Sequence, residues 1–399
     1  MKITISNNKL TVPNTVTIPY ILGDGIGSDI MKASMKVWNF AVEKAYKDER
    51  SIDWLEIFAG EKSVRQTGEL LPRETLSKIK EYVVAIKGPL TTPIGGGFRS
   101  INIAIRQELD LYASIRPVRY FRGVPSPMRN PELVDTIIFR ENTEDLYMGI
   151  EWAYDSKESK EIIEFLKSRY NVNIRENSGI GIKPISEFGT KRIARKGFDF
   201  AINNGKKKVT IVHKGNIMKY TEGAFREWCY EVAKEEYPDK FIREDELGSV
   251  SSDKRIIIND RIADSMFQQM LTRPAEYNVI ITPNLNGDYL SDAVVAQIGG
   301  LGLAPSANIG DFAALYEPVH GSAPKYADKN VANPTSLILS GKMMFEYIGW
   351  TEVASIIEKA IEKTFANRQF TNDIARLVGI SSLKTSEFAQ AVINNMQSI

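Results

Sequence analysis

Two pairs of aspartates lie in the C-terminal half of the chain, and the two members of each pair are four residues apart. Asp260 and Asp264 form one pair, on a stretch predicted to be helical, and Asp288 and Asp292 form the other, directly after an Asn-Leu-Asn-Gly run. At this spacing both carboxylates face one side of a helix, where like charges repel unless a cation lies between them. Oxygen ligands of this kind suit Mg²⁺ or Mn²⁺. The alternative is that the aspartates cap exposed helix starts.

A serine, an amide and an arginine follow three consecutive glycines at positions 95–97. Glycines permit a tight turn and a close backbone approach. Ser100 stands where the N-cap of a helix over residues 101–109 is expected. The start of a helix favours an anion, and Asn102 and Arg106 share one helix face.

Two more arginines extend this group. Arg116 follows a strand predicted over residues 111–115, whose end Pro117 is expected to mark, and Arg140 follows a strand predicted over residues 136–139. Because arginine binds carboxylates through paired hydrogen bonds, the sequence predicts a ligand with several carboxylates. The alternative is a loop, a capped helix and surface arginines.

Tyr147 and Lys214 are the candidate acid and base, and each follows a predicted strand. Tyr147 suits a general acid if nearby cations lower its pKa from ~10 toward neutrality; otherwise it is an amphipathic tyrosine packed at a domain edge. Lys214 is either a surface lysine or a base whose pKa other cations lower.

The elements that must position these residues alternate between strand-like and helix-like stretches, which predicts an α/β fold with parallel strands. The turn after the first strand, Gly23-Asp24-Gly25-Ile26-Gly27, lacks the third glycine of the dinucleotide fingerprint, so we expect no ordinary Rossmann site there. Strands are expected over residues 16–22, 52–58, 82–87, 135–139 and 208–213, and helices over residues 29–46, 72–80, 186–202, 221–236, 261–271, 335–347, 352–365 and 385–395.

The run Gly-Pro-Leu-Thr-Thr-Pro-Ile-Gly-Gly-Gly-Phe-Arg-Ser-Ile-Asn at residues 88–102 resembles that of the bacterial-type isocitrate dehydrogenases, which are grouped with the isopropylmalate dehydrogenases. The resemblance covers nearly the whole chain. It implies a two-domain α/β fold of the isocitrate/isopropylmalate dehydrogenase type, which binds its cofactor without a Rossmann fold. The implied parts are a large cofactor-binding domain (residues 1–111 and 299–399), a small domain (112–144 and 188–298) and an inserted clasp (145–187) that interlocks two subunits.

The resemblance also implies roles. Tyr147 and Lys214 match the acid–base pair, whereas Asp260 matches no ligand. The implied metal ligands are Asp264, Asp288 and Asp292, and the implied substrate-binding residues are Ser100, Asn102, Arg106, Arg116 and Arg140.

The loop at residues 317–326 resembles the family's adenosine-binding loop; without the resemblance, its histidine is a structural or solvated residue. NAD-using relatives place an aspartate where this chain has Lys325, so NADP is implied as the cofactor. Asn372 departs from the tyrosine of NADP-using members, which predicts a weaker preference. The implied cofactor-binding residues are Thr91, Arg273, His320, Gly321, Lys325, Tyr326, Asn333, Asn372 and Arg376.

The implied reaction is oxidative decarboxylation of isocitrate to 2-oxoglutarate with NADP and Mg²⁺ or Mn²⁺. Ser100 and Asn102 are expected to contact the carboxylate that distinguishes isocitrate from isopropylmalate. The alternatives are a homoisocitrate or 3-isopropylmalate type dehydrogenase and a non-catalytic regulatory subunit. A regulatory subunit is expected to lose part of the acid, base and metal set, all of which is present here.

The bulk composition is ordinary: 399 residues, a formal net charge of +1 and 43% hydrophobic residues. No global field points to nucleic acid or a membrane, no apolar run approaches the ~20 residues of a span, and no signal peptide is evident at the N-terminus. The single Cys229 excludes an internal disulfide. We therefore expect a cytoplasmic protein.

The charged stretch at residues 151–178 is either a solvated surface segment or, by the resemblance, the clasp of a homodimer. The resemblance further implies that Lys214 and Asp264 reach into the neighbouring subunit's site.

Overall fold

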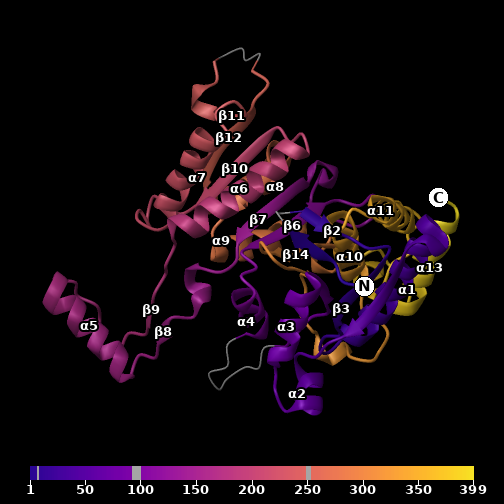
Figure 1. The fold of residues 1–399 in the computed structure, drawn as a ribbon. Coiled ribbons are helices and arrows are strands. Elements are labelled where there is room, and N and C mark those ends of the chain that lie inside the picture. Colours follow the sequence, from indigo (N-terminus) through magenta and orange to yellow (C-terminus); the bar gives the residue numbers. More distant parts are fainter. Residues whose placement is uncertain (7–8, 92–99, 249–252) are drawn as a thin grey trace.

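The computed structural model describes residues 1–6, 9–91, 100–248 and 253–399, and a single 11-stranded sheet runs through its centre (Figure 1). In spatial order the strands are β11 (Phe241–Arg243), β12 (Ile256–Ile262), β10 (Lys208–His213), β13 (Val279–Thr282), β7 (Asp135–Glu141), β6 (Ala113–Arg119), β14 (Pro305–Ile309), β15 (Ala314–Pro318), β5 (Val84–Lys87), β3 (Thr15–Ile21) and β4 (Ser51–Glu56). A separate hairpin pairs β1 (Thr4–Ser6) with β2 (Lys9–Thr11).

Helices cover this sheet. On one flank are α6 (Glu187–Asn203), α7 (Glu222–Glu236), α8 (Ala263–Thr272) and α9 (Asn284–Gln297); around the other are α1 (Gly27–Tyr46), α2 (Glu61–Thr67), α3 (Arg73–Tyr82), α4 (Ile101–Glu108), α10 (Thr335–Tyr347), α11 (Thr351–Ala366), α12 (Asn372–Ala375) and α13 (Thr385–Gln397). Short 3-10 turns are η1 (Lys47–Glu49), η2 (Pro131–Leu133), η3 (Asp145–Met148), η4 (Glu244–Glu246), η5 (Pro274–Glu276), η6 (Leu301–Leu303) and η7 (Pro324–Tyr326).

The inner strands are apolar on both faces because helices pack on both. Val209 and Ile211 of β10 join the apolar cluster beneath α6 and α7, whereas Val212 joins the cluster that contains α8 and α9. The same alternation separates Ile281 from Ile280 on β13. A strand that is buried on both faces therefore has consecutive apolar residues in its sequence, as the inner strands β10 and β13 do.

The prediction of parallel strands is correct only for the two flanks of the sheet. β11 to β7 and β15 to β4 are parallel, but β7–β6, β6–β14 and β14–β15 are antiparallel. The connection from β6 to β7 contains only the turn η2, and β14 is joined to β15 by a short hairpin loop. A hairpin loop as short as the one between β14 and β15 can join only antiparallel strands.

Most predicted elements are found within about two residues of their expected ends, but two predictions are wrong. Asp260 and Asp264 do not share a helix, because Asp260 lies on β12 and Asp264 lies in the first turn of α8. Pro117 does not end β6, which continues to Arg119. Pairing with β14 stops at Ile115, so the missing N–H of Pro117 leaves no gap in that ladder.

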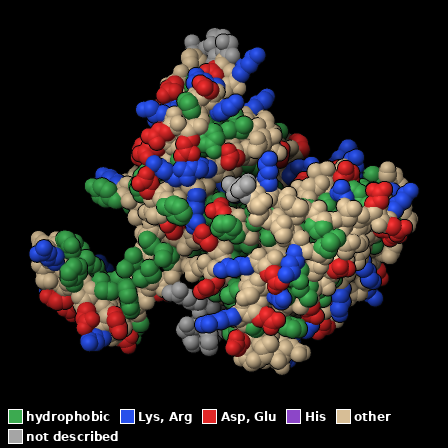
Figure 2. Space-filling view, in the orientation of Figure 1, with side chains coloured by type: hydrophobic (Ala, Val, Ile, Leu, Met, Phe, Trp, Pro, Cys, Tyr) green, Lys and Arg blue, Asp and Glu red, His purple; other side chains and the backbone are tan. Residues whose placement is uncertain are grey.

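An arm made of residues 150–184 projects from the body (Figure 1). It consists of α5 (Lys157–Tyr170) and the antiparallel pair β8 (Glu151–Trp152) and β9 (Ile180–Gly181). Ser156 caps α5 by accepting the Ser159 N–H at 3.1 Å. Large apolar side chains stay exposed on the arm: Tyr154, Phe165, Tyr170, Val172 and Ile182. Figure 2 shows hydrophobic side chains gathered over this part of the molecule.

Across the described part of the chain, no helix has both the length and the apolar character of a membrane span.

Candidate active site

The candidate residues gather where the parallel strands end. Lys87 is the last residue of β5, Glu317 lies one residue before the end of β15, and Arg140 lies one before the end of β7. Lys214 follows the end of β10. Open α/β sheets bind ligands at the carboxyl ends of their strands. Because β15 and β7 run in opposite directions, these ends point to opposite edges of the sheet, and the candidate site lies between the two flanks, at the antiparallel centre that carries Arg116.

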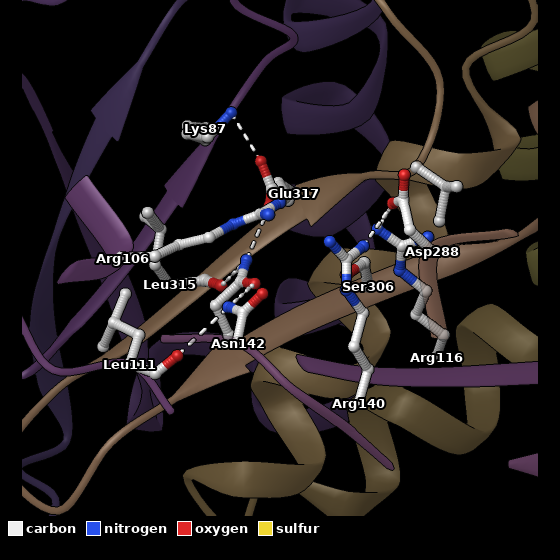
Figure 3. A network of polar contacts seen from close by, with 12 residues as sticks. Lys87, Arg106, Leu111, Arg116, Arg140, Asn142, Asp288, Ser306, Leu315 and Glu317 are labelled. Atoms are coloured by element: carbon white, nitrogen blue, oxygen red, sulfur yellow. Dashed lines mark hydrogen bonds and ion pairs between the residues drawn. The ribbon is translucent and has the colours of Figure 1, made fainter. Parts of the chain in front are cut away.

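Three arginines lie together in the candidate site, and Figure 3 shows Arg116 beside Arg140. Arg140 is fully buried; its Nε donates to Asn284 Oδ1 at 2.8 Å and its Nη1 pairs with Asp288. Burial, followed by repulsion from Arg140 and Arg106, lowers the pKa of Arg116 to about 10. Arg140 Nη2 and Arg116 Nε are buried and have no hydrogen-bond partner among the described residues. Cations that repel each other and retain unused donors form a site for an anion.

A buried carboxylate holds the third arginine in place. Glu317 Oε1 accepts from Arg106 Nη2 at 2.8 Å and from the Asn308 side-chain amide at 2.6 Å, and Glu317 Oε2 lies 2.6 Å from Lys87 Nζ. Asn308 Oδ1 in turn accepts from the Asn142 side-chain amide at 3.0 Å. Burial raises the pKa of Glu317, but Lys87 and Arg106 outweigh it and hold that pKa well below the usual range.

The predicted site residues did not include Glu317, which pairs with Arg106, or its other partners Lys87 and Asn308. The signal was present in the Val-Ala-Ile-Lys stretch of β5, where every residue is buried and a lysine therefore requires a partner.

A cavity of about 110 Å³ opens between these groups. Arg106, Arg116, Asn102 and Glu317 line it together with His320. The Oδ1 atom of Asn102 is buried and finds no hydrogen-bond donor within the described chain. The cavity therefore presents cations to an anionic ligand, and the unused Asn102 oxygen can accept from a hydroxyl group of that ligand.

The predicted cofactor residues surround a neighbouring cavity of about 330 Å³. Its lining includes His320, Gly321, Tyr326, Asn333, Asn372 and Arg376. Lys325 places its ammonium 4.9 Å from the centre of the Tyr326 ring. Arg273 is not brought to this cavity; it is half exposed beside Glu276, 3.8 Å away. His320 and Gly321 line both cavities, so the two are adjacent.

His320 is ready to accept a hydrogen bond from a ligand. Its Nδ1 lies 3.0 Å from the Gly321 carbonyl oxygen, which can only accept, so Nδ1 carries the proton. Nε2 is then an acceptor; it is buried and no described residue donates to it. Burial lowers the pKa of His320, which keeps the ring neutral. An orphaned acceptor in an apolar-walled cavity fits the amino group of a nucleotide base.

The Gly-Asp-Gly-Ile-Gly turn supports this cavity from behind. A Cβ atom on Gly25, whose φ is +56°, would lie 2.0 Å from the Ser322 carbonyl oxygen, so only glycine permits this approach. Asp24 accepts the Thr91 N–H at 2.8 Å, and Thr91 Oγ1 lies 2.7 Å from Ser322 Oγ. The turn thus fixes Thr91 against the cofactor loop.

Tyr147 lies in η3 and donates its hydroxyl to Asp288 Oδ2 at 2.6 Å. The Arg140 guanidinium lies 4.7 Å from the centre of its ring. The expectation that cations lower its pKa is wrong for this arrangement: burial, with the hydrogen bond to Asp288, outweighs Arg140 and raises the pKa of Tyr147 to about 12. Tyr147 is therefore protonated at neutral pH and available as a donor.

The predicted metal ligands fall into two groups. Asp288 and Asp292 share one face of α9 and face Arg116 at 3.9 and 3.5 Å, respectively. Asp264 instead pairs with Lys214 at 2.5 Å. Nowhere in the described ranges do three His, Cys, Asp or Glu side chains converge as a metal site. Burial and Asp288 nevertheless raise the pKa of Asp292 despite Arg116, so the carboxylate pair on α9 fits a divalent cation.

Asp260 is already bound by three side chains. Its carboxylate accepts from Arg226 Nε at 3.0 Å and from the Tyr230 hydroxyl at 2.8 Å, and it lies 3.0 Å from His213 Nε2. This agrees with its lack of a predicted role.

Ser100 occupies the N-cap position of α4, as predicted, and Asn102 and Arg106 follow on that helix. The predicted glycine turn at residues 95–97 lies outside the described residues.

The fold and site define a class of protein: a mixed α/β protein in which buried arginines and paired carboxylates meet beside a cavity suited to a nucleotide. Residues 17–392 match the family described as isocitrate/isopropylmalate dehydrogenase, and the chain belongs to that family.

Individual relatives agree with this assignment. A protein of Archaeoglobus fulgidus named isocitrate dehydrogenase (NADP) is 56% identical over 402 residues, which cover 100% of this chain and 97% of that protein. A Staphylococcus epidermidis protein of the same name is 51% identical and is covered to 99%, as is this chain. The crystal structure of isocitrate dehydrogenase from Methylococcus capsulatus superposes with a TM-score of 0.81 at 39% identity, covering 96% of this chain and 99% of that chain. The predicted family and fold class are confirmed.

Proposed function

We propose that this chain catalyses the oxidative decarboxylation of isocitrate to 2-oxoglutarate and CO₂ with reduction of NADP. The observation that carries the proposal is the adjacency of two cavities: one lined by buried arginines, the other by the candidate nucleotide residues, with His320 and Gly321 common to both. The names of the full-length relatives support the same substrate and cofactor.

The substrate is a tricarboxylate, and the site supplies cations for it. Arg106, Arg116 and Arg140 bind the carboxylates, each charged hydrogen bond contributing roughly 1.5–3 kcal/mol. Asn102 lines the same cavity, where its side-chain NH₂ group can donate to a carboxylate, and Ser100 stands at the start of its helix. We assign these two residues to the carboxylate that isopropylmalate lacks.

Proton transfer falls to Lys214 and Tyr147. Lys214 removes the proton of the substrate hydroxyl while the hydrogen on the same carbon leaves as hydride. When bound, NADP supplies the hydride acceptor, and Mg²⁺ or Mn²⁺ on Asp288 and Asp292 supplies polarisation of the substrate oxygen. The bond to the leaving carboxylate then breaks, its electron pair remains on the substrate, and the protonated Tyr147 delivers a proton to that carbon.

The cofactor is held at its adenosine end by the residues around the larger cavity. Lys325, Tyr326 and Arg376 are assigned to the 2′-phosphate, because two cations beside a phenol hydroxyl suit a phosphate. Within the described chain, Arg273 pairs with Glu276 and does not line the nucleotide cavity, and Asp264 pairs with Lys214 instead of joining Asp288 and Asp292. Both are explained if a second subunit completes the site.

We accordingly propose a homodimer with shared active sites. The arm exposes apolar side chains such as Phe165 and Tyr170, and beyond Lys214 the side chains of Ile217 and Tyr220 are 69% and 93% exposed. Exposed apolar groups of this size mark surfaces that associate. The domain boundaries at 111/112, 144/145, 187/188 and 298/299, a role in the tricarboxylic acid cycle and a cytoplasmic location belong to the same proposal.

Complementation between two inactive variants tests the shared site. Lys214→Met and Asp288→Asn homodimers are each expected to be nearly inactive, since loss of an acid–base group costs roughly 10²–10⁴ in rate. A heterodimer of the two pairs the intact Asp288 of one chain with the intact Lys214 of the other and regains one normal site. Mixed refolding should restore at most about a quarter of normal activity, because half of randomly formed dimers are mixed. Inactive heterodimers, verified by mass spectrometry, would show that each chain carries a complete site.

A further inference from the structure

Lys183 lies at the base of the arm, and its ammonium bridges two buried carboxylates. Its Nζ lies 2.5 Å from Asp145 Oδ1 and 2.9 Å from Glu222 Oε1. The Asp145 side chain is 1% exposed and that of Glu222 is fully buried. Buried carboxylates need a counter-charge, and Lys183 supplies it to both. The predicted site did not include any of these three residues.

The first carboxylate organises the turn that carries Tyr147. Asp145 is the first residue of η3 and has φ +69°, a left-handed backbone conformation that residues other than glycine rarely adopt. Its Oδ2 accepts the Leu285 N–H in the first turn of α9 at 2.9 Å, and its own N–H donates to the Pro184 carbonyl oxygen at 2.9 Å. Asp145 therefore fixes Tyr147 against the helix that carries Asp288.

The second carboxylate organises the turn that carries Lys214. Glu222 is the first residue of α7, and its Oε2 accepts the Lys214 backbone N–H at 2.5 Å. The same oxygen accepts from the Asn286 side-chain amide at 2.7 Å. Glu222 thus ties the Lys214 turn to the start of α9 as well.

We propose that Lys183 is a positioning residue that joins the Tyr147 turn to the Lys214 turn. The inference rests on the proposed shared sites: Tyr147 acts in its own chain's site and Lys214 in the partner's. A side chain that holds both turns therefore couples the geometry of the two sites of the dimer. Lys183 and Pro184 are the last two residues of the arm, so the position of the arm on the body also depends on this network.

The test uses the complementing heterodimer, purified through a different affinity tag on each chain. Its one intact site takes Tyr147 from the Lys214→Met chain and Lys214 from the Asp288→Asn chain. Lys183→Met is added to one chain or the other, so that each placement disturbs only one turn of the intact site. We expect each placement to lower kcat by roughly tenfold to a hundredfold, the effect of a small misplacement, with the KM for NADP unchanged.

Lys191→Met is the matched control. Lys191 also bridges two carboxylates, Glu187 at 2.6 Å and Glu231 at 3.1 Å, and is similarly covered, with 19% of its side chain exposed against 15% for Lys183. It contacts neither catalytic turn, so kcat should stay within twofold. If Lys183→Met fails to give a folded dimer, Lys183→Met/Glu222→Gln, which removes a negative charge as well, takes its place with the same expectation.

The outcomes are separable. An active parent heterodimer whose kcat is unaffected by Lys183→Met on either chain overturns the positioning role. A loss from only one placement limits Lys183 to one turn and overturns the coupling. An inactive parent heterodimer overturns the shared sites and the coupling between subunits with them.

Discussion

Glu317 and Glu244 bind the same three kinds of side chain but differ in burial. Glu317 pairs with a lysine, an arginine and an asparagine, and its side chain is 6% exposed. Glu244 accepts from Lys208, Arg261 and Asn259, each at 2.9 Å, and is 37% exposed. The two glutamates therefore form a matched pair in which burial is the main variable.

Replacing each by glutamine removes the charge and keeps the volume. Glu317→Gln leaves Lys87 and Arg106 without their buried counter-charge, and breaking a buried pair in this way costs ~3–5 kcal/mol of unfolding free energy. Glu244→Gln should cost about 1 kcal/mol or less, because solvent screens a partly exposed pair. The expected difference is thus at least ~2 kcal/mol.

The pH dependence has a definite sign. The folded-state pKa of Glu317 is held below that of a glutamate in the unfolded chain, about 4.3. Its stabilisation is therefore fully present above that value and is lost only as the pH falls through the lower folded-state pKa. The contribution of the Glu317 carboxyl group itself should stay constant from pH 8 to pH 6. Burial lowers the pKa of Lys87 and Glu317 opposes that shift, so in Glu317→Gln the loss of stability should be smaller at pH 8, where Lys87 is more easily neutral, than at pH 6.

The assay is urea unfolding of the ligand-free protein, followed by tryptophan fluorescence and circular dichroism. Since Glu317 also orients Arg106, the KM for isocitrate should rise in Glu317→Gln and not in Glu244→Gln. Equal losses of stability in the two variants, or a loss below about 1 kcal/mol for Glu317→Gln, would refute the reasoning.

The remaining predictions concern ligands. Ser100→Asp should raise the KM for isocitrate by at least about tenfold through charge repulsion, whereas Ser100→Asn should not; normal kinetics in Ser100→Asp would reduce Ser100 to a helix cap. Lys325→Asp should lower the preference for NADP over NAD, and equal efficiency with both cofactors in the unmodified enzyme would mean that Asn372 decides the preference. Exhaustive chelation should abolish turnover, and Mg²⁺ or Mn²⁺ should restore it; undiminished turnover would exclude the metal role of Asp288 and Asp292.

Local patterns in the sequence predicted local structure well. The spacing of Asp288 and Asp292 placed both on one face of a helix, and α9 carries them so. The corresponding prediction for Asp260 and Asp264 was wrong because β12 passes directly into α8 at Ile262. With no Gly or Pro between them, no residue marks the boundary.

Long-range partners could not be predicted from the sequence. Lys87 and Glu317 are 230 positions apart, and only the adjacent placement of β5 and β15 makes them a pair. The antiparallel pairing of β6 with β14 could not be predicted for the same reason, since these two strands are far apart in the chain. A family resemblance supplied the site residues that matched known motifs, but it did not supply the residues that hold them.

The crowding of Arg106, Arg116 and Arg140 has a consequence for turnover. The three cations repel each other, and a bound tricarboxylate offsets that repulsion. Under the proposed reaction the substrate loses one carboxylate as CO₂, so the product neutralises the group less completely than the substrate did. The repulsion that Arg140 and Arg106 exert on the buried Arg116 then favours departure of the dicarboxylate. The chemical step itself thus weakens the binding of its product, and the same three side chains serve both capture and release.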